Sequence, residues 1–386
     1  MNDRILRLQK RLCEDGLDGA LYATSANMQY FLDDSAYAWQ RTPYTGFAIP
    51  GPNGHQLNVP DCVFYIPAGG EPVLFMSYAR ARDMGHLPYR QVVDYFCRMA
   101  DMMEGTVRGS RLACGESCNG FLQQIVHEFL PEAELVDGEH YGTELRAVKD
   151  EKEIAVMRRL CALTDEAMGK VTEMLRPGVT NAQVEAYIGQ IGYEAGCREL
   201  PFPPTVRFYK TGGEEPFNVD GFRTPATLRP GSSISFDFGY TRDGYCTDFG
   251  RSFYCGQAPA EIADGYKALQ EAQLEVIGRI KPGDPMTYGF DMIQRHLDAR
   301  GYGEWLRHYF DFDLLGHQVG IDVHEGPWLH NRQEAVFQPG MIFTIEPKFW
   351  WQGQCFMRVE DMVLITDTGA ECLTNFSRTL FELPAD

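Results

Sequence analysis

Hydrophobic positions in the first part of the chain predict short strands that alternate with helices. Ile5, Leu8 and Leu12 would share one face of a helix over residues 3–14, because residues three and four apart lie on the same side of a helix. Apolar runs bounded by proline and glycine predict strands; they lie at residues 18–24, 63–66 and 72–76. A further helical segment follows at residues 121–129. This alternation is typical of a small α/β domain.

The pattern changes near residue 144, where a long amphipathic run of charged and apolar residues begins. Its apolar members would form one face of a helix; they are Ile154, Met157, Leu160, Cys161 and Met168. Pro177 and Gly178 end this run. Since a chain of 386 residues is too long for one ordinary core, we expect two domains, residues 1–143 and 144–386.

The second domain contains a weak internal duplication. Residues 174–188 and 279–293 both end a helix on a basic residue followed by Pro-Gly and then begin another helix. A hydrophobic hairpin with two carboxylates follows each segment. This repetition predicts two similar halves in a pseudo-twofold arrangement, with a site between them.

The two hairpins predict pairs of facing carboxylates. Asp237 would face Asp248 across a four-residue turn. Glu346 would face Glu360 across a turn centred on Gly353. Facing residues on antiparallel strands bring their Cβ atoms within about 5.5 Å of each other. Like charges at such positions are destabilising unless cations lie between them.

These carboxylates and one histidine together predict a metal centre. The segment GHQVGIDVHEGP, residues 316–327, holds two histidines seven positions apart. A buried carboxylate is costly unless it is paired or bound to a metal, and two divalent ions would neutralise four of them. The predicted ligands are Asp237, Asp248, His317, Glu346 and Glu360. The alternative is that the acids are exposed on outer strand faces, and Asp361 competes with Glu360 for the inward position.

Charge and composition exclude some classes of partner. The formal net charge of −19 argues against nucleic acid and anionic membrane surfaces, since both favour basic patches. The first residues lack the apolar core of a signal peptide, and no apolar run is long enough to span a membrane, so we expect a cytoplasmic protein. The eleven cysteines are scattered, which indicates buried thiols; Cys246 and Cys255 flank Asp248, but hard oxygen ligands dominate this set.

The motif set resembles that of the creatinase, aminopeptidase P, prolidase and methionine aminopeptidase superfamily. It comprises Asp237, Asp248 eleven residues later, the segment GHxxGxDxHExP, IEP and RxED. The resemblance implies an α+β chain whose residues 144–386 form a pita-bread catalytic domain with pseudo-twofold symmetry. It also implies a smaller creatinase-type α/β domain at residues 1–143.

The resemblance further implies roles for the site residues. Asp237 and Asp248 are similar to the pair that holds one metal, and His317, Glu346 and Glu360 to the ligands of the other. Asp248 and Glu360 would bridge the two. Family members use manganese, which is our first expectation, or zinc, cobalt or iron, and a water between two such ions becomes a nucleophile.

Other residues match positions that act in catalysis. Glu346 is similar to the carboxylate that serves as general base. His324 matches the histidine that contacts the substrate or the tetrahedral intermediate, and Arg358 matches an arginine that supports the ligands.

Two positions depart from the peptidase pattern, and both concern the handling of the substrate. Peptidases of the family usually carry a histidine before the first aspartate ligand. Here Phe217, Asn218 or Arg223 stands in that region, and Arg223 would bind a carboxylate unless it is a surface arginine. Asp313 stands four positions before His317, where Xaa-Pro peptidases often have a histidine.

An aromatic run near the N-terminus is a third candidate for substrate contact. Trp39 lies in this run, and its ring would help to cage a quaternary cation or a proline ring. A place in the core or in a dimer interface is the alternative.

The leading hypothesis is a dinuclear metal-dependent hydrolase of the aminopeptidase P and prolidase type that cleaves a small peptide or peptide-like amide. One alternative is a non-peptidase relative that acts on a small zwitterion, by creatinase-like hydrolysis or by elimination as in dimethylsulfoniopropionate lyase. A non-catalytic binding protein on the same fold is the alternative of another class. The resemblance also implies a homodimer.

Overall fold

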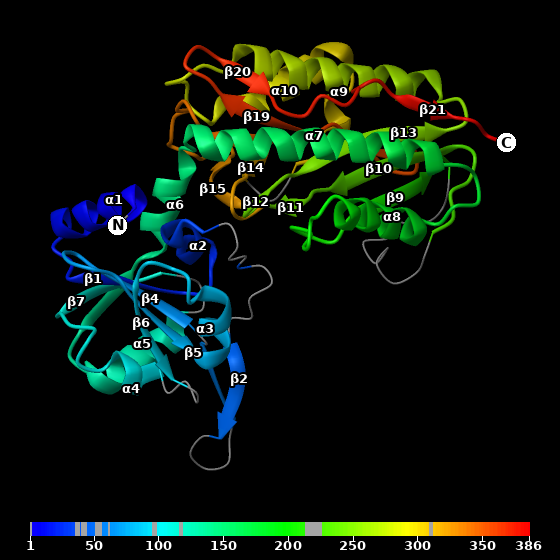
Figure 1. Cartoon of the computed structure of the whole chain (residues 1–386). Coiled ribbons are helices and arrows are strands. Elements are labelled where there is room, and N and C mark those ends of the chain that lie inside the picture. Colours follow the sequence, from blue (N-terminus) through cyan, green and yellow to red (C-terminus); the bar gives the residue numbers. More distant parts are fainter. Residues whose placement is uncertain are drawn as a thin grey trace. The chain divides into compact units, whose positions relative to one another are not determined.

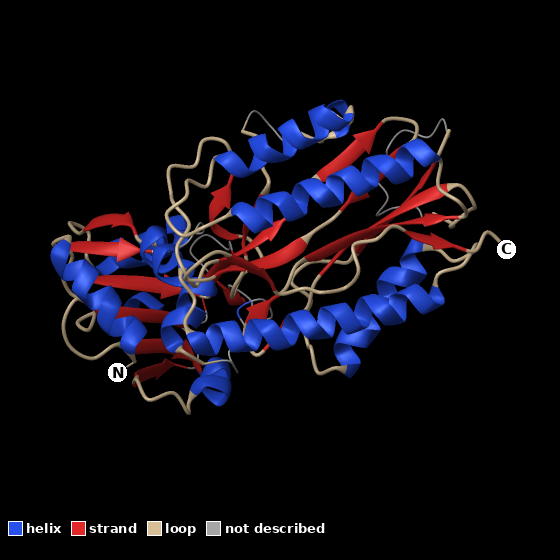
Figure 2. Cartoon of the chain, turned by 90° about the horizontal axis from the view of Figure 1, so that it is seen from above, coloured by secondary structure: helices blue, strands red, loops and turns tan. Residues whose placement is uncertain are grey.

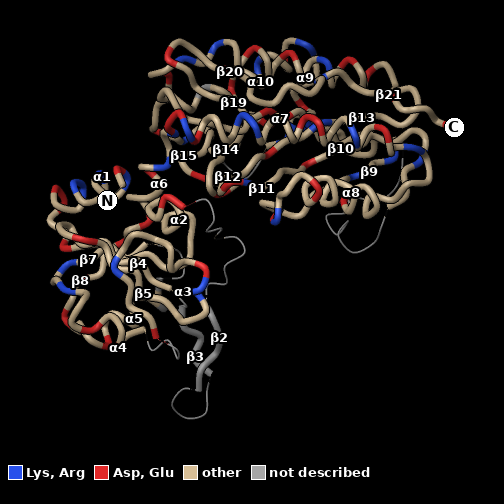
Figure 3. The backbone as a smooth tube through the Cα atoms, viewed as in Figure 1, with Lys and Arg blue, Asp and Glu red and all other residues tan. Residues whose placement is uncertain are grey.

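The computed structural model describes residues 2–34, 39, 45–50, 56–60, 62–94, 99–115, 119–212, 226–308 and 312–386. The chain divides into two compact units, Met1–Arg146 and Ala147–Asp386. This division comes three residues after the boundary at residue 143 expected from the sequence. Acidic and basic positions are interspersed along both units (Figure 3).

The first unit is built on a six-stranded mixed sheet in the order β6-β5-β4-β1-β7-β8 (Figure 1). Its strands are β1 (Gly19–Ala23), β4 (Cys62–Pro67), β5 (Val73–Ser77), β6 (Arg90–Asp94), β7 (Arg111–Cys114) and β8 (Glu134–Asp137). A separate pair is formed by β2 (Thr45–Pro50) and β3 (Gln56–Pro60). Strand β4 is antiparallel to β1 and β5, whereas β1 is parallel to β7.

Six helices accompany this sheet among the described residues. They are α1 (Asp3–Glu14), α2 (Ala26–Leu32), α3 (Tyr78–Met84), α4 (Met99–Met103), α5 (Asn119–Phe129) and α6 (Glu139–Ala147). Ile5, Leu8 and Leu12 of α1 are fully buried, so the predicted apolar face is confirmed. Asn2 caps α1 by accepting a hydrogen bond from the backbone N–H of Ile5 at 2.9 Å.

The second unit holds two larger sheets. The four-stranded sheet has the order β21-β13-β10-β9; its strands are β9 (Thr205–Lys210), β10 (Ser232–Phe238), β13 (Phe249–Cys255) and β21 (Phe381–Leu383). The five-stranded sheet has the order β15-β14-β16-β19-β20; its strands are β14 (Gly316–Gln318), β15 (Glu325–Leu329), β16 (Ile342–Ile345), β19 (Asp361–Ile365) and β20 (Ala370–Cys372).

Each sheet of the second unit shares a hydrophobic core with its own helices. Helices α7 (Glu151–Met174) and α8 (Asn181–Glu194) pack with the four-stranded sheet. Helices α9 (Ala260–Arg279) and α10 (Tyr288–Arg300) pack with the five-stranded sheet. Figure 2 shows the strands between these helices. The repeated combination of helices and strands agrees with the predicted duplication.

Helix α7 shows how the local sequence fixes an element. Asp150 and Glu153 form a capping box at its start. The predicted apolar face is buried; Ile154, Met157, Leu160, Cys161 and Met168 are each at most 8% exposed. Among the described helices, none has both the length and the apolar composition needed to cross a bilayer.

The first hairpin corrects one prediction of register. Asp237 pairs with Gly250 and not with Asp248. The four-residue turn assumed at residues 241–244 is a two-residue turn, because β11 (Thr241–Arg242) pairs with β12 (Tyr245–Cys246). Asp243 and Gly244 have φ values of 53° and 83°, the left-handed conformation that an Asp-Gly hairpin turn favours. The shorter turn shifts the partners by two residues.

The second hairpin confirms the predicted register. Ile345 pairs with Asp361, and β17 (Lys348–Trp351) continues the same register with β18 (Cys355–Arg358). The two ladders are interrupted where Glu346 and Glu360 lie across from each other. Glu346 therefore lies directly after β16 and Glu360 directly before β19, where their side chains can turn toward a common point.

Candidate metal centre

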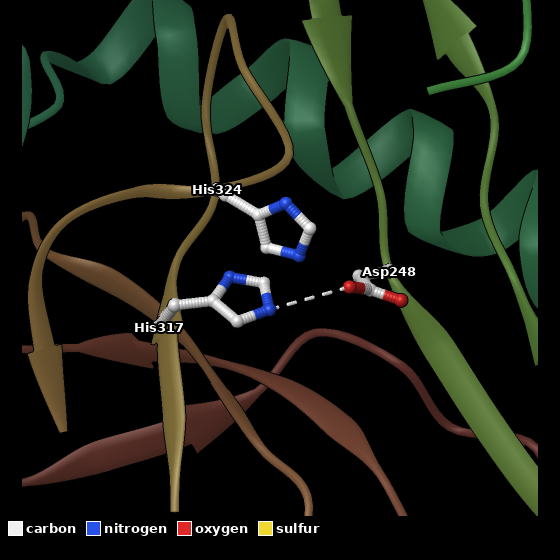
Figure 4. A group of neighbouring side chains, drawn as sticks. All are labelled: Asp248, His317 and His324. Carbon is white, nitrogen blue, oxygen red and sulfur yellow. Dashed lines mark ion pairs between the residues drawn. The ribbon is translucent and has the colours of Figure 1, made fainter. Parts of the chain in front are cut away.

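The carboxylates and histidines predicted as a site come together from both sheets of the second unit. Potential ligand atoms of Asp237, Asp248 and Glu360 lie within 4.8 Å of one another. The same holds for Asp248, His317 and His324, whose side chains converge in Figure 4. The His317 Nε2 atom is 3.5 Å from Asp248 Oδ2. Asp248, immediately before β13, is thus common to two groups of metal-ligating side chains.

Gly250 makes room for this convergence. A Cβ atom at this position would lie 2.7 Å from Glu360 Oε2 and 2.5 Å from Arg358 Cδ. The backbone N–H of Glu360 donates to the Gly250 carbonyl at 3.0 Å, so the two backbone segments are in direct contact. In the corrected register a glycine, Gly250, lies opposite Asp237 and leaves room for the side chains of Arg358 and Glu360. Asp248 lies two residues before Gly250, diagonally across from Asp237.

Arg358 is the buried cation between three of the carboxylates. Its guanidinium forms an ion pair with Asp237 and lies 3.0 Å from Glu346 Oε2 and 3.2 Å from Glu360 Oε2. The side chain is 5% exposed. Unlike charges at these distances offset the repulsion among the acids.

Glu346 has partners at both carboxylate oxygens. Its Oε1 atom accepts a hydrogen bond from Thr344 Oγ1 at 3.2 Å and lies 3.4 Å from His317 Nε2. Its Oε2 atom is bound by Lys348 and Arg358. Burial would raise the pKa of Glu346, but Lys348, His317 and Arg358 hold it well below its usual value.

The pKa values of Asp248 and Glu360 are shifted in the direction opposite to that of Glu346. Burial raises the pKa of Asp248 to about 6 although His317 lowers it, and burial raises the pKa of Glu360 well above its usual value although Arg358 lowers it. For His317, burial lowers the pKa, but the contacts with Asp248 and Glu346 raise it to about 10.

The donor set fits divalent metal ions. Within the part of the chain that the structure describes, Asp248 Oδ1 and Glu360 Oε1 are buried without a hydrogen-bond partner, and Glu360 Oε2 makes the ion pair with Arg358 but no hydrogen bond. Unsatisfied buried oxygens are costly, and a cation between them would remove this cost. Carboxylates and one imidazole are ligands that manganese, zinc, cobalt and iron all accept, so these residues fit the group without selecting among the metals.

His324 lies on the exposed side of the site. Its ring centroid is 4.5 Å from that of His317, and it stacks on Trp328 at 5.5 Å with an interplanar angle of 16°. Trp328 on β15 also lies 5.2 Å from the ring of His317. The indole therefore packs against both imidazoles, of which that of His317 is buried and that of His324 is exposed.

Of the remaining predicted site residues, two have local contacts of their own, and the others lie outside the described residues. Asp313 has φ 41° and lies 2.7 Å from His308 Nδ1. Trp39 donates its backbone N–H to Gln29 at 3.1 Å within the first unit. Arg223, with the neighbouring Phe217 and Asn218, lies outside the described residues.

Asp361 points away from Glu360, its neighbour in the chain. Its Oδ1 atom is 2.7 Å from Arg251 Nη2, and its Oδ2 atom is 2.7 Å from Arg378 Nε. Strand alternation thus selects Glu360 as the inward residue. Among described residues, the groups of potential ligands contain neither Cys246 nor Cys255, both of which are buried thiols.

Sequence reasoning missed Lys348, Thr344 and Trp328. Residues two apart on a strand share a face. This rule could have identified Thr344 and Lys348, because each lies two positions from Glu346. Trp328 lies directly after GHQVGIDVHEGP, and no local pattern distinguished it from a core aromatic residue.

Comparison with known proteins agrees with this geometry. The sequence model of metallopeptidase family M24 matches residues 155–367. An uncharacterized peptidase of Staphylococcus saprophyticus is 27% identical over 358 residues, which cover 88% of this chain and 95% of that protein. An uncharacterized peptidase of Staphylococcus aureus is 30% identical over 236 residues, which cover 61% of this chain and 64% of that protein.

Solved structures share the fold over nearly the whole chain. A prolidase from Pyrococcus horikoshii has a TM-score of 0.80 at 22% identity, covering 98% of this chain and 100% of that one. An Xaa-Pro dipeptidase from Bacillus anthracis has a TM-score of 0.78 at 21% identity, covering 99% of both chains. A histidine-to-alanine variant of Escherichia coli aminopeptidase P has a TM-score of 0.73 at 20% identity, covering 96% of this chain and 94% of that one. The predicted pita-bread fold with a preceding α/β domain is confirmed.

Proposed function

Because this chain belongs to metallopeptidase family M24, we propose that it is a metal-dependent hydrolase that cleaves the amide bond of a small peptide, with Xaa-Pro peptides as the first class to test. The observation that carries the proposal is the shared position of Asp248. Its carboxylate lies within 4.8 Å of ligand atoms of Asp237 and Glu360 in one group and of the two histidines in the other.

The proposed ligands are the five residues predicted from the sequence. Asp237 and Asp248 would hold one ion, His317, Glu346 and Glu360 the other, and Asp248 and Glu360 would be shared. Two divalent ions, with manganese as the first expectation, would supply an acidified water and a polarised carbonyl group when bound. The four carboxylates, of which only Asp237 is partly exposed, would supply negative charge for two such ions, and Arg358 and Lys348 offset part of that charge.

The chain's own residues would then orient and protonate the reactants. Glu346, which is held at both oxygens, would accept the proton that the attacking water loses. His324, exposed and held against Trp328, would donate a hydrogen bond to the oxygen of the scissile carbonyl group as charge develops there. Arg358 would keep Asp237, Glu346 and Glu360 in fixed positions.

A second candidate is a reaction on a small zwitterion that is not a peptide. Asp313 favours it, because an acid that contacts His308 stands where Xaa-Pro peptidases often carry a histidine. Arg223 would bind the carboxylate of such a substrate. We keep the homodimer, the cytoplasmic location and the substrate contacts of Trp39 as expectations from the sequence.

The test is turnover by the full chain after loading with manganese, zinc, cobalt or iron. The proposal predicts chelator-sensitive release of the first residue from Xaa-Pro dipeptides, with Xaa-Ala dipeptides as matched substrates. Loss of turnover in Asp248→Ala, together with lower metal content, is expected. If the metal-loaded protein hydrolyses no peptide but converts a zwitterionic metabolite in a screen, the second candidate is the correct one.

A further inference from the structure

Lys149 is a buried cation that reaches the segment carrying both histidines. Its Nζ atom lies 3.1 Å from Glu325 Oε2, and both side chains are only 1% exposed. The same atom donates to Gln318 Oε1 at 3.0 Å. Gln318 directly follows His317, and Glu325 directly follows His324. One ammonium group therefore joins the two residues next to the two imidazoles.

The partners of Lys149 are themselves tied into the backbone of this segment. Gln318 pairs with Glu325 across the β14–β15 ladder and donates from Nε2 to the Gly326 carbonyl at 3.2 Å. The remaining oxygen of Glu325, Oε1, accepts the backbone N–H of Asp322 at 3.1 Å. The loop between the histidines is thus closed by hydrogen bonds that converge on one carboxylate.

Gly320 shows how little room this arrangement leaves. A Cβ atom there would lie 2.5 Å from Glu325 Oε2. The other end of the network is also fixed, because the Lys149 backbone N–H donates to the Gly340 carbonyl at 3.0 Å and Asp150 caps α7. Lys149 therefore brings a charge from a rigid helix start to the loop.

The energetics of buried ion pairs indicate a role for the pair of Lys149 and Glu325. Burying two charges costs about as much as their attraction returns, so an apolar pair of similar volume is often equally stable. Removal of one partner leaves a buried unpaired charge and is strongly destabilising. A buried pair is therefore weak evidence for stability, and its other use is to fix one geometry.

We propose that Lys149 is a positioning residue that sets the placement of His317 and His324 through Gln318 and Glu325. Its effect on turnover rests on the proposed function, because only there do the histidines bind metal and substrate. Its effect on metal affinity does not depend on the substrate, since His317 is held by the same network. The two readouts separate the two proposals.

The experiment compares four variants of the full chain: Lys149→Met, Lys149→Arg, the double variant Lys149→Met/Glu325→Leu, and Lys152→Met as an exposed control on the first turn of α7. Unfolding midpoints, Mn²⁺ affinity by titration calorimetry, kcat and KM are measured for each. Lys149→Met should be less stable to heat, with kcat lower by about tenfold or more and Mn²⁺ affinity lower by several-fold. The reason is that a misplacement of catalytic groups by about 1 Å can cost about 10²-fold in rate. The control should match the wild type.

The double variant decides between a positioning role and a purely structural one. Its apolar pair should restore the unfolding midpoint while kcat and Mn²⁺ affinity stay low. Lys149→Arg keeps the charge and should restore part of kcat and part of the Mn²⁺ affinity. Recovery of kcat and affinity together with stability would overturn the proposal, as would wild-type values of both in a folded Lys149→Met. A protein without peptidase activity whose Mn²⁺ affinity still depends on Lys149 would refute the proposed function and support the positioning role.

Discussion

Glu360 and Asp361 are adjacent in the chain, yet their carboxylates lie in two different networks: Glu360 faces Arg358 and the metal centre, whereas Asp361 binds Arg251 and Arg378 on the other side of the strand. Arg251 contacts both residues, because its Nη1 atom donates to the Glu360 carbonyl at 2.6 Å. The same arginine that pairs with Asp361 thus holds the backbone from which Glu360 points inward.

This division predicts opposite effects for two similar substitutions. Asp361→Asn should lower the free energy of unfolding by about 3–5 kcal/mol, because it leaves the buried Arg251 and the partly exposed Arg378 without their charge partner. Glu360→Gln should leave the metal-free protein as stable or more stable, since burial raises the pKa of this carboxyl, and it should abolish tight metal binding. Urea unfolding with and without chelator measures both effects, and equal losses in the two variants would contradict the assignment.

The pH dependence of metal binding should follow the carboxyls of Asp248 and Glu360. Because burial raises the pKa of Asp248 to about 6, a metal ion must displace a proton from it at lower pH. Mn²⁺ affinity should fall by about tenfold for each pH unit below 6 for this proton. The proton of His317 adds a dependence over the whole range up to pH 8, because burial lowers the pKa of His317 but Asp248 and Glu346 raise it to about 10. Since the pKa of Glu360 is raised as well, the dependence becomes steeper if this carboxyl must also lose a proton. Titration calorimetry between pH 5 and 8 tests this prediction. An affinity that does not change over that range would exclude both carboxyls as ligands.

His324→Ala should separate substrate contact from metal binding. If the imidazole donates a hydrogen bond to the substrate, kcat should fall by about a hundredfold or more, while metal content stays unchanged because His317 and the carboxylates are intact. Metal content by mass spectrometry is the second readout. A protein that loses one ion would show instead that His324 is a ligand, as its place beside Asp248 and His317 also permits.

Lys348→Met should strengthen metal binding. The Lys348 ammonium contacts the same oxygen of Glu346 as Arg358, so a metal ion at this carboxylate competes with it. Removal of one unit charge from a partly buried pair should raise Mn²⁺ affinity by about tenfold. Lys348→Arg keeps the charge and serves as the matched control; an unchanged affinity in Lys348→Met would show that Glu346 is not a ligand.

Gly250→Ala should damage the site without removing any charged group. The added methyl group meets Arg358 and Glu360, and overpacking of this kind costs about 1–3 kcal/mol. Gly278→Ala is the control, because Gly278 lies on α9 with nothing within 4 Å of an added Cβ, where alanine favours the helix by about 1 kcal/mol. Thermal unfolding and Mn²⁺ titration of both variants test the prediction, and wild-type Mn²⁺ affinity in a folded Gly250→Ala would contradict it.

The sequence predicted the fold correctly, whereas its prediction of strand register was right for one hairpin and wrong for the other. The register of Glu346 and Glu360 was correct because Gly353 marks the centre of the turn, and its φ of 77° needs a glycine. The register of Asp237 was wrong by two residues because Asp243-Gly244 forms the tighter turn. In each case the decisive fact was the conformation of one or two turn residues.

Contacts between distant segments were beyond the reach of the sequence. Nothing local to Lys149 indicates that it meets Glu325, and nothing local to Gly250 shows that Arg358 and Glu360 lie above it. Hydrophobic periodicity identifies which face of an element is buried, but it does not say which charged group meets that face. Motif spacing supplied the proposed ligands, whereas the tertiary structure supplied the contacts of their side chains.

The parallel pairing of β21 with β13 has a consequence for how the protein is made. Phe381 lies beside Phe253, so β13 is an open edge, with unpaired backbone groups, until residues 381–383 have left the ribosome. The strands of the six-stranded sheet are all encoded before residue 146, and that unit can fold first as the N-terminal part emerges. Chains stalled or cleaved before residue 381 would carry all five proposed ligands without the closing strand, and such fragments are expected to aggregate rather than acquire metal.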